Sequence, residues 1–453
     1  MINSDPDTST SFHRSCLPSE MLQPNDGNIM SILKNCLGKE LSKVTMPVTL
    51  NEPLSFLQRI CEYMEYAEIL DQAASEEDPA DRMKLVATFA VSALASNWER
   101  IGKPFNPLLG ETYELQRKDF KFLSEQVSHH PPISAFHAES PHYMFYGSIN
   151  PKIRFMGKSI EIQPKGVVTV EFPRWKEAYT WSNVNCCVHN VVVGKLWIEQ
   201  HGTMEIRNHS NGYRAHLEFK ETNSSKEANQ VFGVIENDQK TILYRLYGKW
   251  NELLKCTSEE DYQRYIQHKV DKEANTSHDH HSRKILSKLN SFKMSSFLSV
   301  SMQDDQIDTT LLESLNLNND LSQIPADTKS AILWNANVRP ENSTKYYHFT
   351  DFAMQLNAID PKVSLNTLCP TDSRLRPDIR CLEEGDVAGA SAQKNRLEEK
   401  QRDTKRLRKG KHEKELWKPR WFKFGTNPLT QHEDWMFTGA YWDRNYDFTS
   451  EIF

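Results

Sequence analysis

The spacing of hydrophobic residues changes along the chain, and each spacing predicts a different kind of element. Apolar residues recur every three or four positions over residues 28–46, which predicts one short amphipathic helix. Two further helices are expected within residues 47–111, one from Pro53 and one with Asp78 as its N-cap and Pro79 at its first position. From Thr112 the spacing becomes two, which predicts β-strands.

About ten of these alternating runs follow one another between residues 112 and 250, with Gly, Pro and Asn between them. No helical pattern interrupts them, so they predict an antiparallel sheet that meanders, and a sheet of so many strands tends to curl or close. A large closed sheet can enclose a ligand. We expect this sheet to occupy residues 112–270.

The other parts of the chain differ in composition. Residues 1–27 are polar and aperiodic, as is the Ser-rich stretch 271–329, and both are expected to be disordered. Order is expected to return in residues 330–453. There the runs "ILWNANV" and "KYYHFTDFAMQLN" predict strands, and "VAGASAQKNRLEEKQRDTKRLRKGKHEKELW" predicts a long helix.

Composition and charge exclude several classes of protein. The chain has 55 Lys and Arg against 61 Asp and Glu, so its overall charge argues against a general nucleic-acid binder. Its eight cysteines form no CxxC pair or compact framework, and the N-terminus lacks the apolar core of a signal peptide. Both features indicate reduced thiols in the cytosol. The longest apolar stretch is too short to span a membrane and predicts a buried helix.

The first candidate for chemistry is "SEQVSHHPPISAF", in which His129 and His130 stand before two prolines. The prolines stiffen the exit from a strand, so the imidazoles are held on a rigid corner. Both can serve one ligand only if the chain turns there, because neighbouring strand residues point to opposite faces. The chain has no HExxH and no GxSxG, so we expect neither a metal site nor a nucleophilic triad, and a purely structural corner stays open.

Two further candidates are cationic. Lys103 begins the rigid loop "KPFNPLLGETYE". On the long helix, Lys394, Glu398 and Arg402 recur at i, i+4 and i+8, which places one carboxylate between two cations on one face. Such a ladder is most often a solvated stripe, and it becomes a phosphate clamp if its face looks into a cavity mouth. The basic excess of residues 394–414 also suits an anionic membrane surface.

The pairing of "KPFNPLLGETYE" with "EQVSHHPPISAF" resembles the signature of the oxysterol-binding protein family. The likeness extends from about residue 28 to the C-terminus and includes "TDSRLRPD", "KNRLEEKQR" and "YWDRNY", with the stretch 271–329 outside it. The chain is most similar to the short members, which consist of little beyond the ligand domain. The resemblance implies a mainly β fold with flanking helices: a near-complete antiparallel β-barrel around an apolar tunnel, a lid helix at 28–46 and a C-terminal helical part within 330–453.

The resemblance also implies what the tunnel and its mouth bind. Family members carry a sterol or another lipid in the tunnel, and many alternatively bind a phosphoinositide whose headgroup sits at the entrance. Carried over by position, the headgroup residues are Lys103, His129, His130, Lys394, Glu398 and Arg402. The lid and tunnel residues are Ile29, Ile32, Leu33 and Leu37.

The function expected from the resemblance is the exchange of a sterol for a phosphoinositide between membranes, carried out from the cytosol with peripheral contact to anionic membranes. The alternative is a lipid sensor that binds the same ligands without moving them. No catalytic residue, metal or cofactor is expected, and an enzyme that uses the histidines is the least favoured interpretation.

Overall fold

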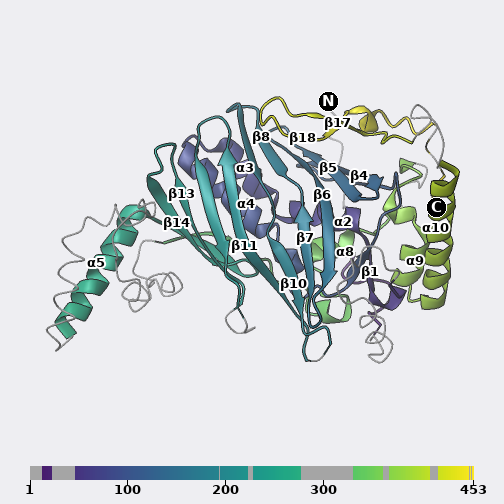
Figure 1. Ribbon diagram of the computed structural model, residues 1–453, viewed down its shortest axis with the longest axis horizontal. Coiled ribbons are helices and arrows are strands. Elements are labelled where there is room, and N and C mark those ends of the chain that lie inside the picture. Colours follow the sequence, from purple (N-terminus) through teal and green to yellow (C-terminus); the bar gives the residue numbers. More distant parts are fainter. Residues whose placement is uncertain are drawn as a thin grey trace, which may run out of the picture.

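The computed structural model describes residues 13–22, 46–192, 194–222, 228–276, 330–360, 367–408, 417–447, 449 and 451–453, without the side chains of 269–276. Most of these residues form one curved antiparallel sheet, with helices behind it and along one flank (Figure 1). The predicted class, mainly β with flanking helices, is confirmed.

The sheet has 14 strands, and its main path runs in the order β16-β15-β14-β13-β12-β11-β10-β7-β6-β5-β4-β3. The strands are β3 (Thr112–Gln116), β4 (Lys121–His129), β5 (Pro132–Glu139), β6 (Met144–Phe155), β7 (Ile160–Lys165), β8 (Val168–Phe172), β9 (Glu177–Trp181), β10 (Asn185–His189), β11 (Trp197–Asn208), β12 (Arg214–Phe219), β13 (Gln230–Glu236), β14 (Ile242–Lys249), β15 (Leu253–Ser258) and β16 (Ala331–Asn335). Sequence neighbours pair with each other along most of this path, so the predicted meander is confirmed.

Strands β8 and β9 connect two distant strands of the sheet. The first half of β6 pairs with β8, and β9 pairs with the end of β11, while the second half of β6 reaches the start of β11 through β7 and β10. The gap between the two long strands is therefore filled twice, by β8 and β9 along one half and by β7 and β10 along the other, and the sheet is continuous across it. The sheet as a whole is curved, and we call it the barrel (Figure 1). Among the described strands, the edges β3 and β16 do not pair with each other.

The turns of the sheet gather at two opposite ends. Because neighbouring strands run in opposite directions, the turns β4–β5, β6–β7 and β10–β11 lie at one end, which we call the histidine end. The turns β3–β4, β5–β6, β11–β12 and β13–β14 lie at the other, which we call the far end. In Figure 1 the lower ends of β6, β7 and β10 belong to the histidine end.

Three helices pack against the inner face of the sheet: α2 (Phe56–Cys61), α3 (Glu68–Ser75) and α4 (Pro79–Ser92). Helix α4 begins as predicted, with the Asp78 carboxylate accepting from the N–H groups of Ala80 and Asp81. Phe89 of α4 lies 5.1 Å from Phe145 of β6, ring centre to ring centre. The core of the molecule thus lies between these helices and the strands.

The helix expected from Pro53 begins later. Asn51–Ser55 form strand β1, which pairs in parallel with β2 (Lys103–Phe105), and α2 starts only at Phe56. The reason is local: Ser55 and Gln58 form a capping box, which fixes the helix start one residue after Ser55.

The C-terminal part adds two layers. Helices α9 (Pro377–Glu383) and α10 (Val387–Arg408) pack together beside β1, along one flank of the sheet (Figure 1). The hairpin of β17 (Phe422–Thr426) and β18 (Glu433–Phe437) lies against β5 and β6, where Ser148 donates to Asp434 at 2.5 Å.

Three segments differ from the predictions. Residues 13–22, expected to be part of a disordered tail, pack on the fold: Leu17 is 3% exposed and Arg14 forms an ion pair with Glu383 at 2.6 Å. The run "KYYHFTDFAMQLN" contains a short helix, α8 (Asp351–Gln355), because the Thr350 hydroxyl caps the Ala353 N–H. Helix α5 (Glu259–Thr276) begins inside the predicted barrel range and continues into the predicted insertion, whose residues 277–329 lie outside the described residues.

The alternating pattern did not predict β5, β7, β10 and β15 of the large sheet, nor the four strands outside it, β1, β2, β17 and β18. Strand β5 starts at Pro132, the second of the two prolines, which by themselves predict only a stiff exit from the preceding strand. The described cysteines are all free, namely Cys16, Cys61, Cys186, Cys187, Cys256, Cys369 and Cys381. Within the described ranges no helix has the length and apolar character to cross a bilayer.

Candidate functional site

The loop after Lys103 is held in place by a buried ion pair. Lys103 lies on β2, and its carbonyl accepts from Asn51 Nδ2 at 2.9 Å. Further along the loop, the Arg376 guanidinium bonds to the Glu111 carboxylate at 2.8 Å and to the Asn106 carbonyl at 2.9 Å. Both charged groups are buried, so separating them would leave an uncompensated charge in the interior. The loop therefore holds Lys103 in a fixed position.

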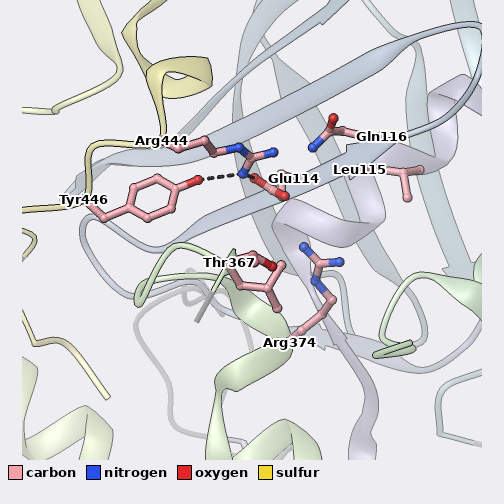
Figure 2. A pocket seen from close by; sticks show the side chains of 8 residues that line it. Glu114, Leu115, Gln116, Thr367, Arg374, Arg444 and Tyr446 are labelled. Carbon is pink, nitrogen blue, oxygen red and sulfur yellow. Dashed lines mark hydrogen bonds and ion pairs between the residues drawn. The ribbon is translucent and has the colours of Figure 1, made fainter. Parts of the chain in front are cut away.

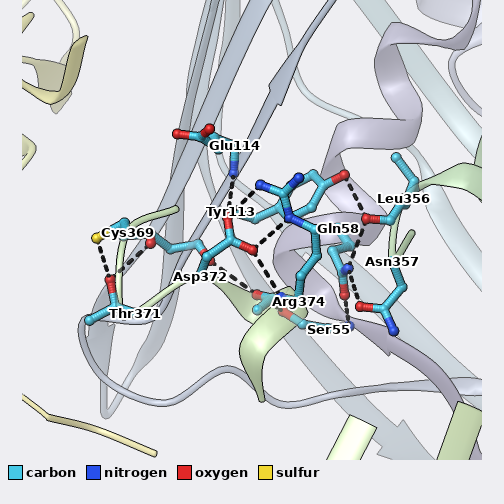
Figure 3. Close-up of polar contacts among 12 residues, drawn as sticks. Ser55, Gln58, Tyr113, Glu114, Leu356, Asn357, Cys369, Thr371, Asp372 and Arg374 are labelled. Atoms are coloured by element: carbon cyan, nitrogen blue, oxygen red, sulfur yellow. Dashed lines mark hydrogen bonds and ion pairs between the residues drawn. The ribbon is translucent and has the colours of Figure 1, made fainter. Parts of the chain in front are cut away.

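The stretch "TDSRLRPD" has a structural role beside β3 (Figure 3). Asp372, which is fully buried, bonds to the Arg374 guanidinium at 2.8 and 2.9 Å. The same carboxylate accepts from the Glu114 N–H at 3.3 Å, and the Tyr113 hydroxyl donates to the Leu356 carbonyl at 2.9 Å. These bonds join β3 to the C-terminal part of the chain.

The two histidines occupy the turn between β4 and β5. His129 ends β4 and pairs with Pro132, the first residue of β5, and the His130–Pro131 peptide bond is cis. The imidazole rings lie 4.4 Å apart; His129 is half-buried and His130 exposed. The chain therefore reverses at the histidines, which meets the condition under which both can face one ligand.

Lys394 and Glu398 point from α10 toward the barrel. The Lys394 ammonium donates to the Met46 carbonyl at 2.9 Å and bonds to the Glu398 carboxylate at 2.9 Å. Its side chain is only 12% exposed, so it is not part of a solvated stripe. The charges of both residues act on Lys103, which places the three groups in one cluster.

Gln401 connects the histidine turn to the proline loop. Its Oε1 accepts from the Leu109 N–H at 2.8 Å, and its Nε2 lies 2.9 Å from His129 Nε2. The sequence does not single out Gln401, because a glutamine on a charged helix carries no distinctive signal by itself. The signal that identifies it is spacing: positions 394, 398 and 401 are four and three apart, the period of one helix face.

Arg402 and His130 lie at the exposed margin. The Arg402 side chain is 52% exposed and bonds to Glu398 at 3.3 Å and to Glu399 at 2.5 Å. The structure thus brings Lys103, Lys394 and Glu398 into one cluster, with His129 within range of the Glu398 charge. It leaves His130 and Arg402 on the solvent side of that cluster.

Burial shifts the protonation of two of these groups. It lowers the pKa of Lys103 to about 8, and the nearby Lys394 ammonium acts in the same direction. It lowers the pKa of His129 to about 4, with His130 and Lys405 contributing. His129 is therefore a neutral imidazole near pH 7, so one ring nitrogen can accept from the Gln401 amide while the other carries a proton. Lys103 and Lys394 share one carboxylate, Glu398, which leaves a positive excess suited to an anionic ligand.

An apolar inner face adjoins this cluster at the histidine end. Cross-strand register on β6, β7 and β10 puts the following side chains on one face: Ile153, Phe155, Ile160, Ile162, Cys186 and Val188. All except Phe155 are only partly buried. Met46, whose carbonyl binds Lys394, packs against Phe155, so the apolar face and the cationic cluster meet at Met46.

The predicted lid and tunnel residues, Ile29, Ile32, Leu33 and Leu37, lie outside the described residues.

A pocket of about 570 Å³ lies beside the edge strand β3 (Figure 2). It is lined by Glu114, Leu115, Gln116, Thr367, Leu368, Arg374, Arg444 and Tyr446. Its guanidinium groups are compensated, since Arg374 bonds to Asp372 and Arg444 to Glu114. In the described parts of the chain, no group of three or more His, Cys, Asp or Glu residues is placed to hold a metal ion.

Residues 28–446 match the family model of the oxysterol-binding proteins. The chain is 49% identical over 440 residues to oxysterol-binding protein-related protein 1 of Rattus norvegicus, an alignment that covers 96% of this chain and 43% of that protein. It is 46% identical to oxysterol-binding protein-related protein 2 of Homo sapiens, with 97% and 88% covered. The chain therefore spans less than half the length of related protein 1.

Solved structures agree with these matches. The Osh1 ORD domain in complex with cholesterol superposes with a TM-score of 0.77 at 32% identity, covering 98% of this chain and 95% of that one. The Osh3 ORD of Saccharomyces cerevisiae in complex with PI(4)P superposes with a TM-score of 0.72 at 27% identity, covering 98% and 99%.

Proposed function

This chain belongs to the oxysterol-binding protein family, and we propose that it binds a sterol inside its barrel and exchanges it for a phosphoinositide between membranes. Similar domains have been solved in complex with cholesterol, ergosterol and PI(4)P. Residues 28–453 would act as one lipid-binding domain, with 28–46 as its lid. The whole process would take place in the cytosol, with peripheral association to organelle membranes and without a catalytic step.

The observation that carries the proposal is the partly buried apolar face at the histidine end, next to a cluster of cations. Ile162 and Val188 lie on the inner side of the barrel without being fully covered. A sterol that covered such side chains would remove apolar area from water, worth roughly 25 cal/mol per Å². A lipid with a long apolar body and a charged head would fill both parts of the site.

The cationic cluster supplies the headgroup contacts in this proposal. A phosphomonoester carries nearly two negative charges and takes several charge-assisted hydrogen bonds, each worth about 1.5–3 kcal/mol. Lys103 and Lys394 would supply cations, and His129 a ring N–H. His130 and Arg402, at the exposed margin, would close over the phosphate from the solvent side. Glu398 would hold the cations in place or accept a bond from an inositol hydroxyl.

Exchange would follow from competition for one cavity. A sterol in a bilayer is already out of water, so its transfer into an apolar barrel brings little net free energy and stays reversible. A phosphoinositide gradient could then drive the sterol in the opposite direction by mass action.

The test is a transfer assay between two populations of liposomes. Sterol transfer from donor to acceptor liposomes should accelerate when the acceptor liposomes contain PI(4)P. The PI(4)P should move in the opposite direction, from acceptor to donor. If the protein binds both lipids in titrations but sterol movement is the same with and without PI(4)P, exchange is excluded and the lipid-sensor alternative takes its place.

A further inference from the structure

The hairpin of β6 and β7 projects beyond its neighbours at the histidine end. Strand β5 pairs with β6 only as far as Ile149, and β6 continues to Phe155. The turn that follows is fixed, because the Met156 N–H donates to the Ser159 carbonyl at 2.8 Å. Gly157 has a φ of 89°, a conformation that favours glycine. The Met156 side chain is 61% exposed at this tip.

A second turn supports the first. The Val191 N–H of the β10–β11 turn donates to the Lys158 carbonyl at 3.1 Å. Val191 and Val192 pack around Phe155 and Met46 on the inner side. The exposed methionine is therefore held on a framework of two turns rather than on a loose loop.

The surface around this tip is basic. Lys152 and Arg154 are exposed on the outer face of β6, Lys158 lies in the turn, and Lys195 comes from the β10–β11 turn. None of these four has an ion pair among the described residues. The hairpin's carboxylate is Glu161, opposite Arg154. Such a cluster is unexpected in a chain with a net charge of −6.

The basic helix α10 differs in this respect. Arg402 bonds to Glu399 at 2.5 Å, and Arg406 bonds to Asp403 at 2.7 Å. Those guanidinium charges are compensated along the helix itself. The four cations around the hairpin, in contrast, have no carboxylate within ion-pair distance among the described residues.

The hairpin also lies beside the proposed lipid entrance. Phe155, the residue before the exposed tip, packs against Met46, and the Met46 carbonyl binds Lys394. An exposed apolar side chain surrounded by cations without ion pairs is complementary to a bilayer with anionic headgroups. The headgroups attract the cations, and the acyl boundary accepts the apolar side chain.

We propose that the β6–β7 hairpin docks this protein on anionic bilayers, with Met156 inserted at the headgroup boundary and Lys152, Arg154, Lys158 and Lys195 on the lipid phosphates. This rests on the proposed function insofar as docking brings the barrel's entrance to the membrane. It names the surface that makes the contact, which the lipid-binding residues do not.

The test is flotation of the full chain with vesicles of phosphatidylcholine, with and without phosphatidylserine, and without sterol or phosphoinositide. Each basic residue at an anionic surface raises the affinity for the membrane about fivefold. The double variant Arg154→Glu with Lys158→Glu should therefore lower the membrane partition constant by at least about 25-fold. Met156→Asp should lower it roughly tenfold by removing the inserted apolar group. Wild-type binding should itself depend on phosphatidylserine and fall with salt.

The matched control reverses two exposed lysines on turns at the far end, Lys118→Glu with Lys240→Glu, which changes the net charge equally. It should float like the wild type. Equal loss in the control, or undiminished flotation of the hairpin variants, overturns the proposal. Sterol uptake from a cyclodextrin complex in solution separates this question from the lipid-binding function. Hairpin variants should take up sterol normally, whereas failure of the wild type to take it up would reject the proposed function and leave docking to be judged by flotation.

Discussion

The two ends of the barrel are built from the same alternating strands but hold their apolar side chains differently. Toward the far end, helices α2–α4 cover the inner face, and Phe136 and Phe145 are 0% and 1% exposed. At the histidine end Ile162 and Val188, on the inner face of β7 and β10, stay partly exposed. An apolar face left partly open costs free energy in water. The far end therefore supplies packing that stabilises the fold, whereas the histidine end leaves the apolar area that the proposed sterol would cover.

The largest effect is expected from damage at the filled end. Phe136 lies 5.1 Å from Phe145 and 6.0 Å from Tyr63, ring centre to ring centre. Phe136→Ala should lower the free energy of unfolding by about 3–5 kcal/mol, because it leaves a cavity among close-packed rings. Val188→Ala at the histidine end should cost less than about 1.5 kcal/mol, since its side chain is already partly exposed. Urea unfolding of both variants measures the two losses in the free energy of unfolding. Equal losses would contradict the difference in packing between the two ends.

The next effect concerns the rim of the histidine end. His129→Ala with His130→Ala should weaken phosphoinositide binding by roughly 100-fold or more, because two hydrogen bonds to a charged phosphate are lost. Sterol uptake should be spared. His142→Ala, an exposed histidine in the β5–β6 turn at the far end, is the control. Parallel loss of both ligands in the double variant would mean that the histidines are a structural corner only.

Filling the open end should block the sterol and leave the fold intact. Ile162 points into the barrel and its neighbour Gln163 points out, and both are partly buried. Ile162→Trp should reduce sterol affinity by at least about tenfold by occupying the cavity. Gln163→Trp should bind sterol as the wild type does. Titration with a fluorescent sterol measures the affinity of both variants. Full affinity in Ile162→Trp would mean that the sterol binds elsewhere in the protein.

A pH dependence is expected only at the cationic rim. The pKa of Lys103 is lowered to about 8, mainly by burial, and a bound phosphate favours its charged form. Binding therefore takes up a proton once the pH exceeds the pKa of the empty site. Affinity for a short-chain phosphoinositide should fall by up to about tenfold per pH unit above that pKa and be flat between that pKa and about pH 7, below which the phosphate begins to take up its own second proton. The Lys103→Met variant should bind the phosphoinositide weakly at every pH. If its affinity still depends on pH, another group takes up the proton.

The smallest effect is expected at Gln401, which positions His129. Gln401→Ala should weaken phosphoinositide binding only a few-fold, since one neutral hydrogen bond is worth about 1 kcal/mol. It should also raise the pKa of His129, because the amide N–H bonds to the neutral ring, and histidine NMR titration would detect this. Gln393→Ala, whose amide binds Arg396 at 2.8 Å, is the control on the same helix. An unchanged His129 titration would contradict the positioning role.

Much of this could be predicted from local patterns. Alternation predicted the antiparallel meander, and the Asp78–Pro79 pair predicted the start of α4. The histidine and proline stretch predicted a rigid corner, and the chain reverses there. These features depend on residues close together in the sequence, so period and turn chemistry suffice to recognise them.

Other features could not be predicted, because they depend on which surfaces meet. The pairs "Cys186–Ile162" and "Val188–Ile160" lie on the inner face through register, which a single strand does not reveal. Gln401 meets Leu109 and His129 across hundreds of residues of sequence. Residues 13–22 look like a solvated tail, yet Leu17 is buried by partners that are distant in the chain.

Local periodicity and turn residues were thus enough to predict the antiparallel meander, the rigid corner at the histidines and the family resemblance. Contacts in the folded chain decide that helices cover the far end while the apolar face at the histidine end stays partly open, and which cations there lack an ion pair. The physical reason is that burial and charge compensation are properties of contacts between distant segments, whereas periodicity records only which residues share a face.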